Sequence, residues 1–171
     1  MSGNGRCPVA KITFKDGSEY MLRLQAFEQH FTSQEPLKRA VAAGAEVVAD
    51  QIRANLDILP EEEYRHLAPG ETFNGLPRGQ KRDLQDSFGL TPIEQDRNGF
   101  LHTKAGFEGY GSFPTNAYPD GVPNPLLARS VESGSSVRQK TPFVEPAVKA
   151  TRKEAVEKMD EVIDNELKQI F

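Results

Sequence analysis

Histidine is the side chain in this sequence best suited to bind a metal or transfer a proton near neutral pH. The chain contains three histidines, at positions 30, 66 and 102. Glu63 precedes His66 with the spacing of a carboxylate-bridged metal motif, but such sites need a second copy of the motif, and the sequence holds none. We interpret Glu61 to Glu63 as a solvated acidic helix end, because runs of like charge usually face solvent. The sequence therefore predicts no metal site at His30, His66 or His102.

Two other patterns could in principle bind phosphate or supply a nucleophile. Gly106, Gly109 and Gly111 loosely resemble a phosphate-binding loop, but the Lys-Ser/Thr pair of a P-loop is missing and no strand leads into a helix there. Ser135 and Ser136 follow a glycine without the Gly-x-Ser-x-Gly pattern of a nucleophile elbow. We therefore expect no catalytic residues, no cofactor and no enzymatic activity.

Glycine and proline are unevenly distributed along the 171 residues, which correspond to about one domain. The chain has 14 glycines and 12 prolines, and sixteen of these lie between Pro69 and Pro125. This clustering predicts an ordered frame at both ends and a loop-rich arm over residues 69–125.

The charge balance argues against several classes of protein. The chain has 21 basic and 25 acidic residues and a net charge of −4, whereas a general nucleic-acid binder shows a concentrated basic face. No apolar run approaches the roughly 18 residues that span a bilayer, and the N-terminus lacks the apolar core of a signal peptide. The single cysteine, Cys7, lies in an expected flexible tail over residues 1–8 and cannot form an internal disulfide. We expect no membrane partner, no sequence-specific nucleic-acid binding and synthesis in a reducing cytoplasm.

Alternating apolar and polar residues near the N-terminus are typical of strands. They cover residues 9–14 and 20–24, and Asp16-Gly17, a dipeptide favoured in tight hairpin turns, stands between them. The pattern predicts an antiparallel hairpin over residues 9–24.

A long amphipathic helix is predicted over residues 33–59. Thr32 and Glu35 have capping-box spacing, and Pro36 is tolerated in the first turn of a helix. Apolar residues then recur at helical spacing: Leu37, Val41, Ala45, Val48, Ile52 and Leu56. Gly44 costs about 1 kcal/mol relative to alanine, which close packing against another backbone would compensate.

The remaining elements are shorter or lie near the C-terminus. Residues 78–88 fit a short helix and residues 100–107 a pair of strands, both within the arm. Residues 126–131 are apolar and fit either a helix or a strand, and a turn separates them from an amphipathic helix that begins near Glu145 or Pro146. These patterns predict an α+β fold: one domain over residues 1–171, with a small antiparallel sheet packed with two long helices and an extended Pro/Gly-rich middle arm.

Two stretches within residues 126–171 carry a more specific pattern. One is the turn Glu132-Ser133-Gly134-Ser135-Ser136, and the other is Pro142-Phe143-Val144-Glu145-Pro146-Ala147, which opens the terminal helix. On physical grounds the phenylalanine would anchor the helix start in the core while the prolines set its angle. Both stretches resemble the C-terminal signature of the neck or tail-component family of long-tailed bacteriophages and prophages. That family is typified by gene product ten of phage HK-ninety-seven and is related in role to lambda's minor tail protein Z.

The resemblance implies a structural role in a siphophage-like virion, in head–tail joining or tail completion. Proteins of this family work as rings of identical subunits, so the implied partners are further copies of the chain, a head connector, and a tail terminator or tail-tube protein. The implied location is the head–tail junction or the tail, after assembly in the cytoplasm of the bacterial host. The alternatives are a small enzyme or ligand-binding protein that uses the middle loops as a lid, and a toxin-like or regulatory protein.

Aromatic residues in the arm are the candidates for contacts between subunits. They are Phe107, Tyr110, Phe113 and Tyr118. Such side chains can anchor in a groove of a partner, or they can cover the core of their own chain, and the sequence favours neither.

Overall fold

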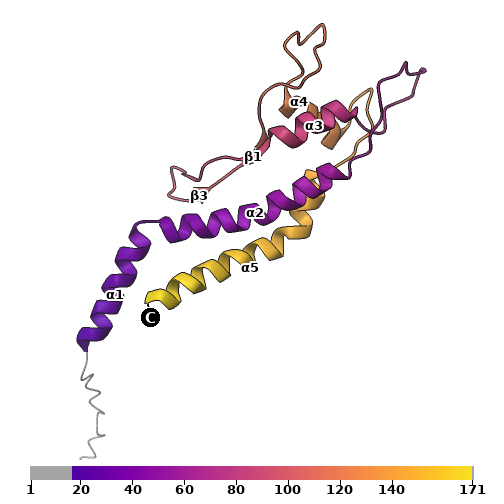
Figure 1. Cartoon of the computed structure of the whole chain (residues 1–171). Helices are drawn as coiled ribbons and strands as arrows, with labels where there is room; N and C mark the ends of the chain where they lie inside the picture. Colours follow the sequence, from indigo (N-terminus) through magenta and orange to yellow (C-terminus); the bar gives the residue numbers. More distant parts are fainter. Residues whose placement is uncertain (1–16, 171) are drawn as a thin grey trace, which may run out of the picture.

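The computed structural model describes residues 17–170 and has an α+β fold. In chain order the elements are α1 (Gly17–Thr32), α2 (Glu35–Asp57), α3 (Arg78–Ser87), β1 (Phe88–Leu90), β2 (Glu94–Gln95), β3 (Leu101–His102), β4 (Ala105–Phe107), α4 (Asn124–Ser133) and α5 (Val144–Ile170). Helices α2 and α5 lie side by side and form a long stem, while α3, α4 and several loops gather over one end of it (Figure 1). No helix in the described part of the chain is long and apolar enough to cross a membrane.

Helix α2 confirms the predicted long helix, with its buried stripe shifted by one position in the first half. The stripe consists of Pro36, Ala40, Gly44, Ala49, Ile52 and Leu56. Leu37, expected on this face, is 40% exposed. The buried residues of the first half are small, which lets α5 approach the backbone of α2 closely.

Gly44 shows how close the two helices are. A Cβ atom at this position would lie 2.6 Å from Met159 Cγ and 3.1 Å from the carbonyl oxygen of Ala155, both on α5. The expected compensation for a mid-helix glycine is therefore confirmed.

Substituting Gly44 with leucine is expected to lower the free energy of unfolding by about 1–3 kcal/mol, because the side chain must push α5 away from α2. Chemical denaturation followed by circular dichroism measures the effect. Ala42→Leu, on the exposed side of the same helix, is the matched control and should change stability by less than about 0.5 kcal/mol. Equal effects of the two substitutions would contradict the close packing at Gly44.

The start of α2 differs from the predicted capping box. Gln34 occupies the N-cap with a left-handed backbone (φ 59°) and makes no side-chain cap, and the Thr32 hydroxyl donates instead to the Glu28 carbonyl at 2.6 Å. Pro36 does lie in the first turn, as expected. Because proline lacks the amide hydrogen that a continuous helix would need, α1 and α2 remain two helices joined at a bend (Figure 1).

The prediction of a strand over residues 20–24 is wrong, since these residues belong to α1. Helix α1 as a whole contains Met, Leu, Arg, Glu and Gln, which favour helix, and a short two-stranded hairpin is marginally stable without further packing. The rings of Phe27 and Phe31, one helical turn apart, contact each other in a tilted arrangement with their centroids 4.8 Å apart. The other predicted strand, residues 9–14, and the tail over residues 1–8 lie outside the described residues.

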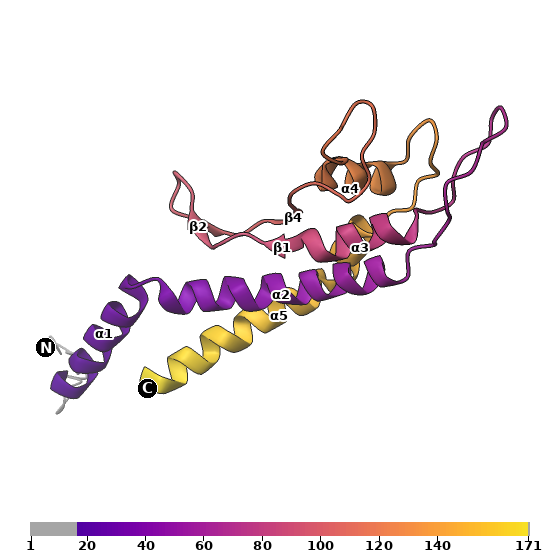
Figure 2. The same cartoon turned by 45° about the horizontal axis from the view of Figure 1, so that its top comes forward.

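The strands come from the middle of the chain. β1 pairs antiparallel with β4, with Phe88 opposite Phe107, and β2 pairs antiparallel with β3. Between the two pairs, the Thr91 amide donates to the Lys104 carbonyl at 2.8 Å, so the four strands form one long, interrupted hairpin. The hairpin leaves the end of α3 and runs back along α2 (Figure 2).

The main core lies where α3, α4 and the start of α5 cover the C-terminal half of α2. Its buried members are Ile52, Leu56, Leu59, Leu76, Leu84, Leu127, Ala128, Val131, Phe143 and Ala147. Residues 78–87 are helical as predicted, and the strand alternative for residues 126–131 is wrong, because residues 124–133 form α4. α4 buries Leu127, Ala128 and Val131, which follow helical spacing.

The acidic residues Glu61 to Glu63 lie in an extended loop rather than at a helix end.

Candidate functional site

The residues of the C-terminal signature meet where α5 begins. Both carboxylate oxygens of Glu132, at the end of α4, accept backbone amide hydrogens from the first turn of α5. The donors are Phe143 at 2.7 Å, Val144 at 2.9 Å and Glu145 at 2.9 Å. The first amides of a helix have no partner within the helix, and its dipole favours negative charge there. Glu132 is thus an N-cap supplied from a distant part of the sequence.

Phe143 fixes the same helix start from the core side. Its side chain is 1% exposed, and its ring meets that of Phe107 edge-on, with centroids 5.9 Å apart. Its backbone carbonyl accepts a hydrogen bond from Asn55 Nδ2 on α2 at 2.8 Å. Pro142 and Pro146 flank this anchor and are themselves exposed.

The turn between α4 and α5 requires glycine at position 134 because of its backbone conformation. Gly134 has φ +78°, and a Cβ there would lie 3.0 Å from the Lys140 amide nitrogen. Ser135 and Arg138 then exchange two backbone hydrogen bonds. The guanidinium of Arg138, 6% exposed, donates to the carbonyl of Gly75 and to Gln80 Oε1, which ties this turn to the 61–76 loop and to α3.

Within the arm, the loop over residues 108–123 is anchored to α3 by two contacts. The amide and hydroxyl of Ser112 donate to the Asp83 carboxylate at 2.7 and 2.6 Å. The ring of Phe113 lies against Gly79, where a Cβ would be only 2.5 Å from it. Gly111 and Val122 close the base of the arm with a backbone hydrogen bond of 2.8 Å. Residues 108–123 therefore form a folded loop that lies on its own chain.

The four aromatic residues singled out in the arm separate into two groups. Phe107 packs against the main core, between Phe88 and Phe143, and so covers its own chain. Phe113 combines its contact with α3 with 37% exposure. Tyr110 and Tyr118 are 67% and 38% exposed, respectively, and remain the candidates for contacts with a partner.

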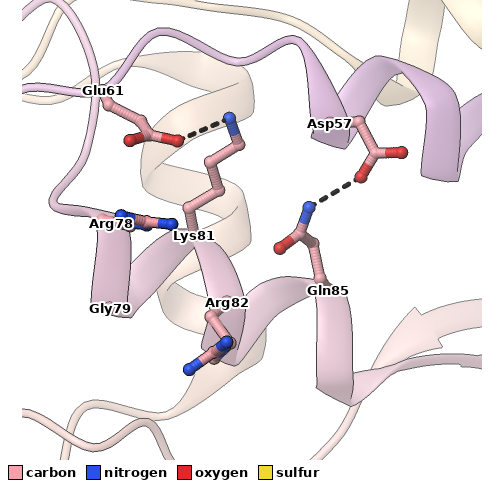
Figure 3. A pocket seen from close by; sticks show the side chains of 7 residues that line it. All are labelled: Asp57, Glu61, Arg78, Gly79, Lys81, Arg82 and Gln85. Atoms are coloured by element: carbon pink, nitrogen blue, oxygen red, sulfur yellow. Dashed lines mark hydrogen bonds and ion pairs between the residues drawn. The ribbon is translucent and has the colours of Figure 1, made fainter.

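A polar groove on α3, which the sequence did not predict, has a volume of about 560 Å³ (Figure 3). It is lined by Asp57, Glu61, Arg78, Gly79, Lys81, Arg82 and Gln85. Figure 3 shows that both carboxylates are already engaged: Asp57 accepts from Gln85 Nε2 at 2.6 Å, and Glu61 from Lys81 Nζ at 3.0 Å. The spacing of Arg78, Lys81 and Arg82 on one side of a helix was a signal that could have revealed this basic surface.

The histidines lie on three separate elements. His66 is exposed in the 61–76 loop, and His102 lies on β3. No group of three or more His, Cys, Asp or Glu side chains suited to hold a metal occurs among residues 17–170. Cys7 is outside that range.

His30 belongs to an ionic cluster at the end of the stem where α1 meets α2. Glu166 on α5 accepts from Arg39 Nε on α2 at 2.8 Å and contacts His30 Nε2 on α1 at the same distance. The hydrogen bonds from Arg39 and His30 hold the pKa of the Glu166 carboxyl below its usual value. The cluster joins three helices.

Comparison of the chain with known protein families, with characterised proteins and with solved structures finds no match.

Proposed function

We propose that this protein is a structural component of the virion of a siphophage or prophage, which acts as an oligomeric ring in head–tail joining or tail completion. The proposal builds on the resemblance of residues 126–171 to the phage neck and tail-component signature. The hydrogen bonds of Glu132 and the burial of Phe143 give the signature residues a mechanical role. Together they fix the angle at which α5 leaves the main core.

The observation that carries the proposal is the uncovered apolar surface at both ends of the molecule. On α1, which projects from the stem, Met21 is 54% and Leu22 is 65% exposed. On the arm, Tyr110 is 67% exposed. Burying these exposed apolar side chains against another chain would be favourable, because it removes apolar surface from water. Two different surfaces at opposite ends suit a heterologous contact, which produces a ring when the rotation closes.

The proposed partners are those that the resemblance of residues 126–171 implies. Neighbouring copies of the chain would cover α1 and the arm within the ring. The head connector would lie on one side of the ring, and the tail terminator or tail-tube protein on the other. The protein would take its place at the head–tail junction or tail of the particle after assembly in the host cytoplasm.

Replacing Tyr110 and Tyr118 together with serine should weaken self-association at least about tenfold, because exposed aromatic anchors carry much of the energy of such contacts. Light scattering after size-exclusion chromatography measures the oligomer. The melting temperature should stay within about 2 °C of wild type, since both side chains are exposed. Phe100→Ser, at the exposed tip of the β2–β3 hairpin, is the matched control and should assemble normally.

Mass spectrometry of purified particles tests the role in the virion itself. Several copies of the chain per particle are expected. Consistent absence of the chain from complete particles would contradict the proposal, whatever the behaviour of the purified protein.

The alternative, a ligand-binding protein, is favoured by one observation: the polar groove on α3 is large enough for a small anion. A thermal-shift titration with phosphate and citrate distinguishes the two functions. Saturable stabilisation by either anion, without self-association, would favour the alternative.

A further inference from the structure

The charges of α5 are segregated along its length. Its first ten residues, 144–153, carry three basic side chains and one acidic one. Residues 154–166 carry six carboxylates and a single lysine. The C-terminal part of α5 is therefore acidic, with Lys158 and Lys168 as its basic residues, although the whole chain has a net charge of only −4.

Part of this acidic half has no counter-charge within the molecule. Glu157 pairs with Lys153, and Glu161 pairs with Lys158. Asp160 and Asp164 are exposed and form no ion pair with any residue in the described part of the chain. Glu157, Asp160 and Asp164 lie three, four and seven positions apart, so they share one outward stripe of the helix. We call residues Glu157, Asp160 and Asp164 the acidic stripe.

The groove on α3 shows the opposite imbalance. Of its two carboxylates, Asp57 accepts from the neutral Gln85 amide and Glu61 pairs with Lys81, while Arg78 and Arg82 form no ion pair among residues 17–170 (Figure 3). These arginines stand four positions apart on the same helix, where like charges repel each other. A planar guanidinium favours paired hydrogen bonds to a carboxylate, so the groove is suited to acidic side chains.

The stripe and the groove cannot meet within one molecule. The acidic half of α5 lies beside the first half of α2, where Arg39 binds Glu166, while the groove lies beside Asp57 at the opposite end of α2. Eighteen residues of helix separate Arg39 from Asp57, a distance of roughly 27 Å. Only a second molecule can bring an acidic stripe to this groove.

We propose that the acidic stripe of one copy docks in the polar groove on α3 of the next copy, so that the chains assemble head to tail. This inference rests on the proposed ring function and names the contact that would build the ring. Asp160 and Asp164 of one copy would accept hydrogen bonds from Arg78 and Arg82 of its neighbour. Each copy offers one stripe and one groove, as a heterologous interface requires.

A charge-swap experiment with the full-length chain tests the pairing. The groove variant Arg78→Glu/Arg82→Glu and the stripe variant Asp160→Lys/Asp164→Lys should each self-associate at least about tenfold more weakly than wild type. An equimolar mixture should regain association to within about threefold of wild type, because a lysine stripe then meets a glutamate groove. Wild-type association should weaken as salt rises, since added salt screens exposed charges. Arg97→Glu/Lys104→Glu, the same charge reversal on the hairpin, is the control and should associate like wild type.

Each of the other results overturns the pairing in a distinct way. If wild type associates and the charge variants associate equally well, this contact is wrong while the ring function stands. The same holds if the two variants fail to rescue each other, or if the groove variant only loses stabilisation by inorganic phosphate, which would make the groove an anion site. If wild type stays monomeric at every concentration and salt, even with cross-linker, both the contact and the ring function are wrong.

Discussion

Replacing Phe143 with alanine should lower the free energy of unfolding by about 3–5 kcal/mol, the usual range for deleting a fully buried phenylalanine. The side chain is 1% exposed and lies in the core formed by α2, α3 and α4. Its loss removes the edge-on contact with Phe107 and leaves a cavity beneath the first turn of α5. The expected fall in melting temperature is roughly 6–20 °C for a chain of this size.

Two controls isolate the cause of that loss. Phe100→Ala removes an equally large ring that is 70% exposed and should change stability by less than about 0.5 kcal/mol. Phe143→Leu keeps most of the buried volume and should cost less than about 1.5 kcal/mol. A loss below about 1 kcal/mol for Phe143→Ala would show that the start of α5 is held by other contacts.

The elements that could be predicted from the sequence are those whose pattern is long and local. α2 and α5 each repeat apolar residues over more than twenty positions, so errors at single positions do not change the result. The close approach at Gly44 was also predictable, because a glycine in a helix needs a compensating contact. The α+β class was right, and the strands predicted over residues 100–107 are present as β3 and β4, whereas residues 20–24 are helical.

The prediction for residues 20–24 failed, and residues 126–131 stayed open between helix and strand, for the same physical reason. Three alternating apolar residues fit a strand and a helix about equally well, and for residues 20–24 the helix propensity of the neighbouring side chains decides. The apolar run at residues 126–131 posed the same ambiguity, which resolved to helix because its apolar positions bury against α3 and α5. Local patterns of this length do not contain the tertiary contact that selects between the two.

The functional surfaces depend on contacts between distant parts of the sequence. The arm is anchored by Asp83 and Ser112, which are 29 positions apart, and no local pattern relates them. The groove joins Asp57 at the end of α2 to the basic side of α3. Phe107 was expected among the arm contacts, yet it packs on Phe143 because β4 brings it over the core. Clustered glycines and prolines predict where an arm lies, but the anchors decide which of its aromatic residues remain exposed.

Replacing Glu132 with alanine should lower the free energy of unfolding by about 2–4 kcal/mol. One side chain supplies acceptors to three amides of α5, where an ordinary N-cap serves one or two and is worth about 0.5–2 kcal/mol. The amides of Phe143 and Val144 are partly buried, so water cannot fully replace the carboxylate, and unpaired buried donors cost about 1–3 kcal/mol. Urea denaturation followed by circular dichroism measures the loss.

The matched substitutions separate the cap from the charge. Glu132→Gln keeps one carbonyl acceptor and removes the negative charge at the helix start, so about half of the loss should return. Glu108→Ala, an exposed acid whose side chain makes no hydrogen bond or ion pair within the described residues, should change stability by less than about 0.5 kcal/mol. Because α5 carries the acidic stripe at its other end, a frayed start would also misdirect that stripe. Glu132→Ala should therefore weaken self-association at temperatures where the chain is still folded, and normal association there would show that the cap stabilises α5 without orienting it.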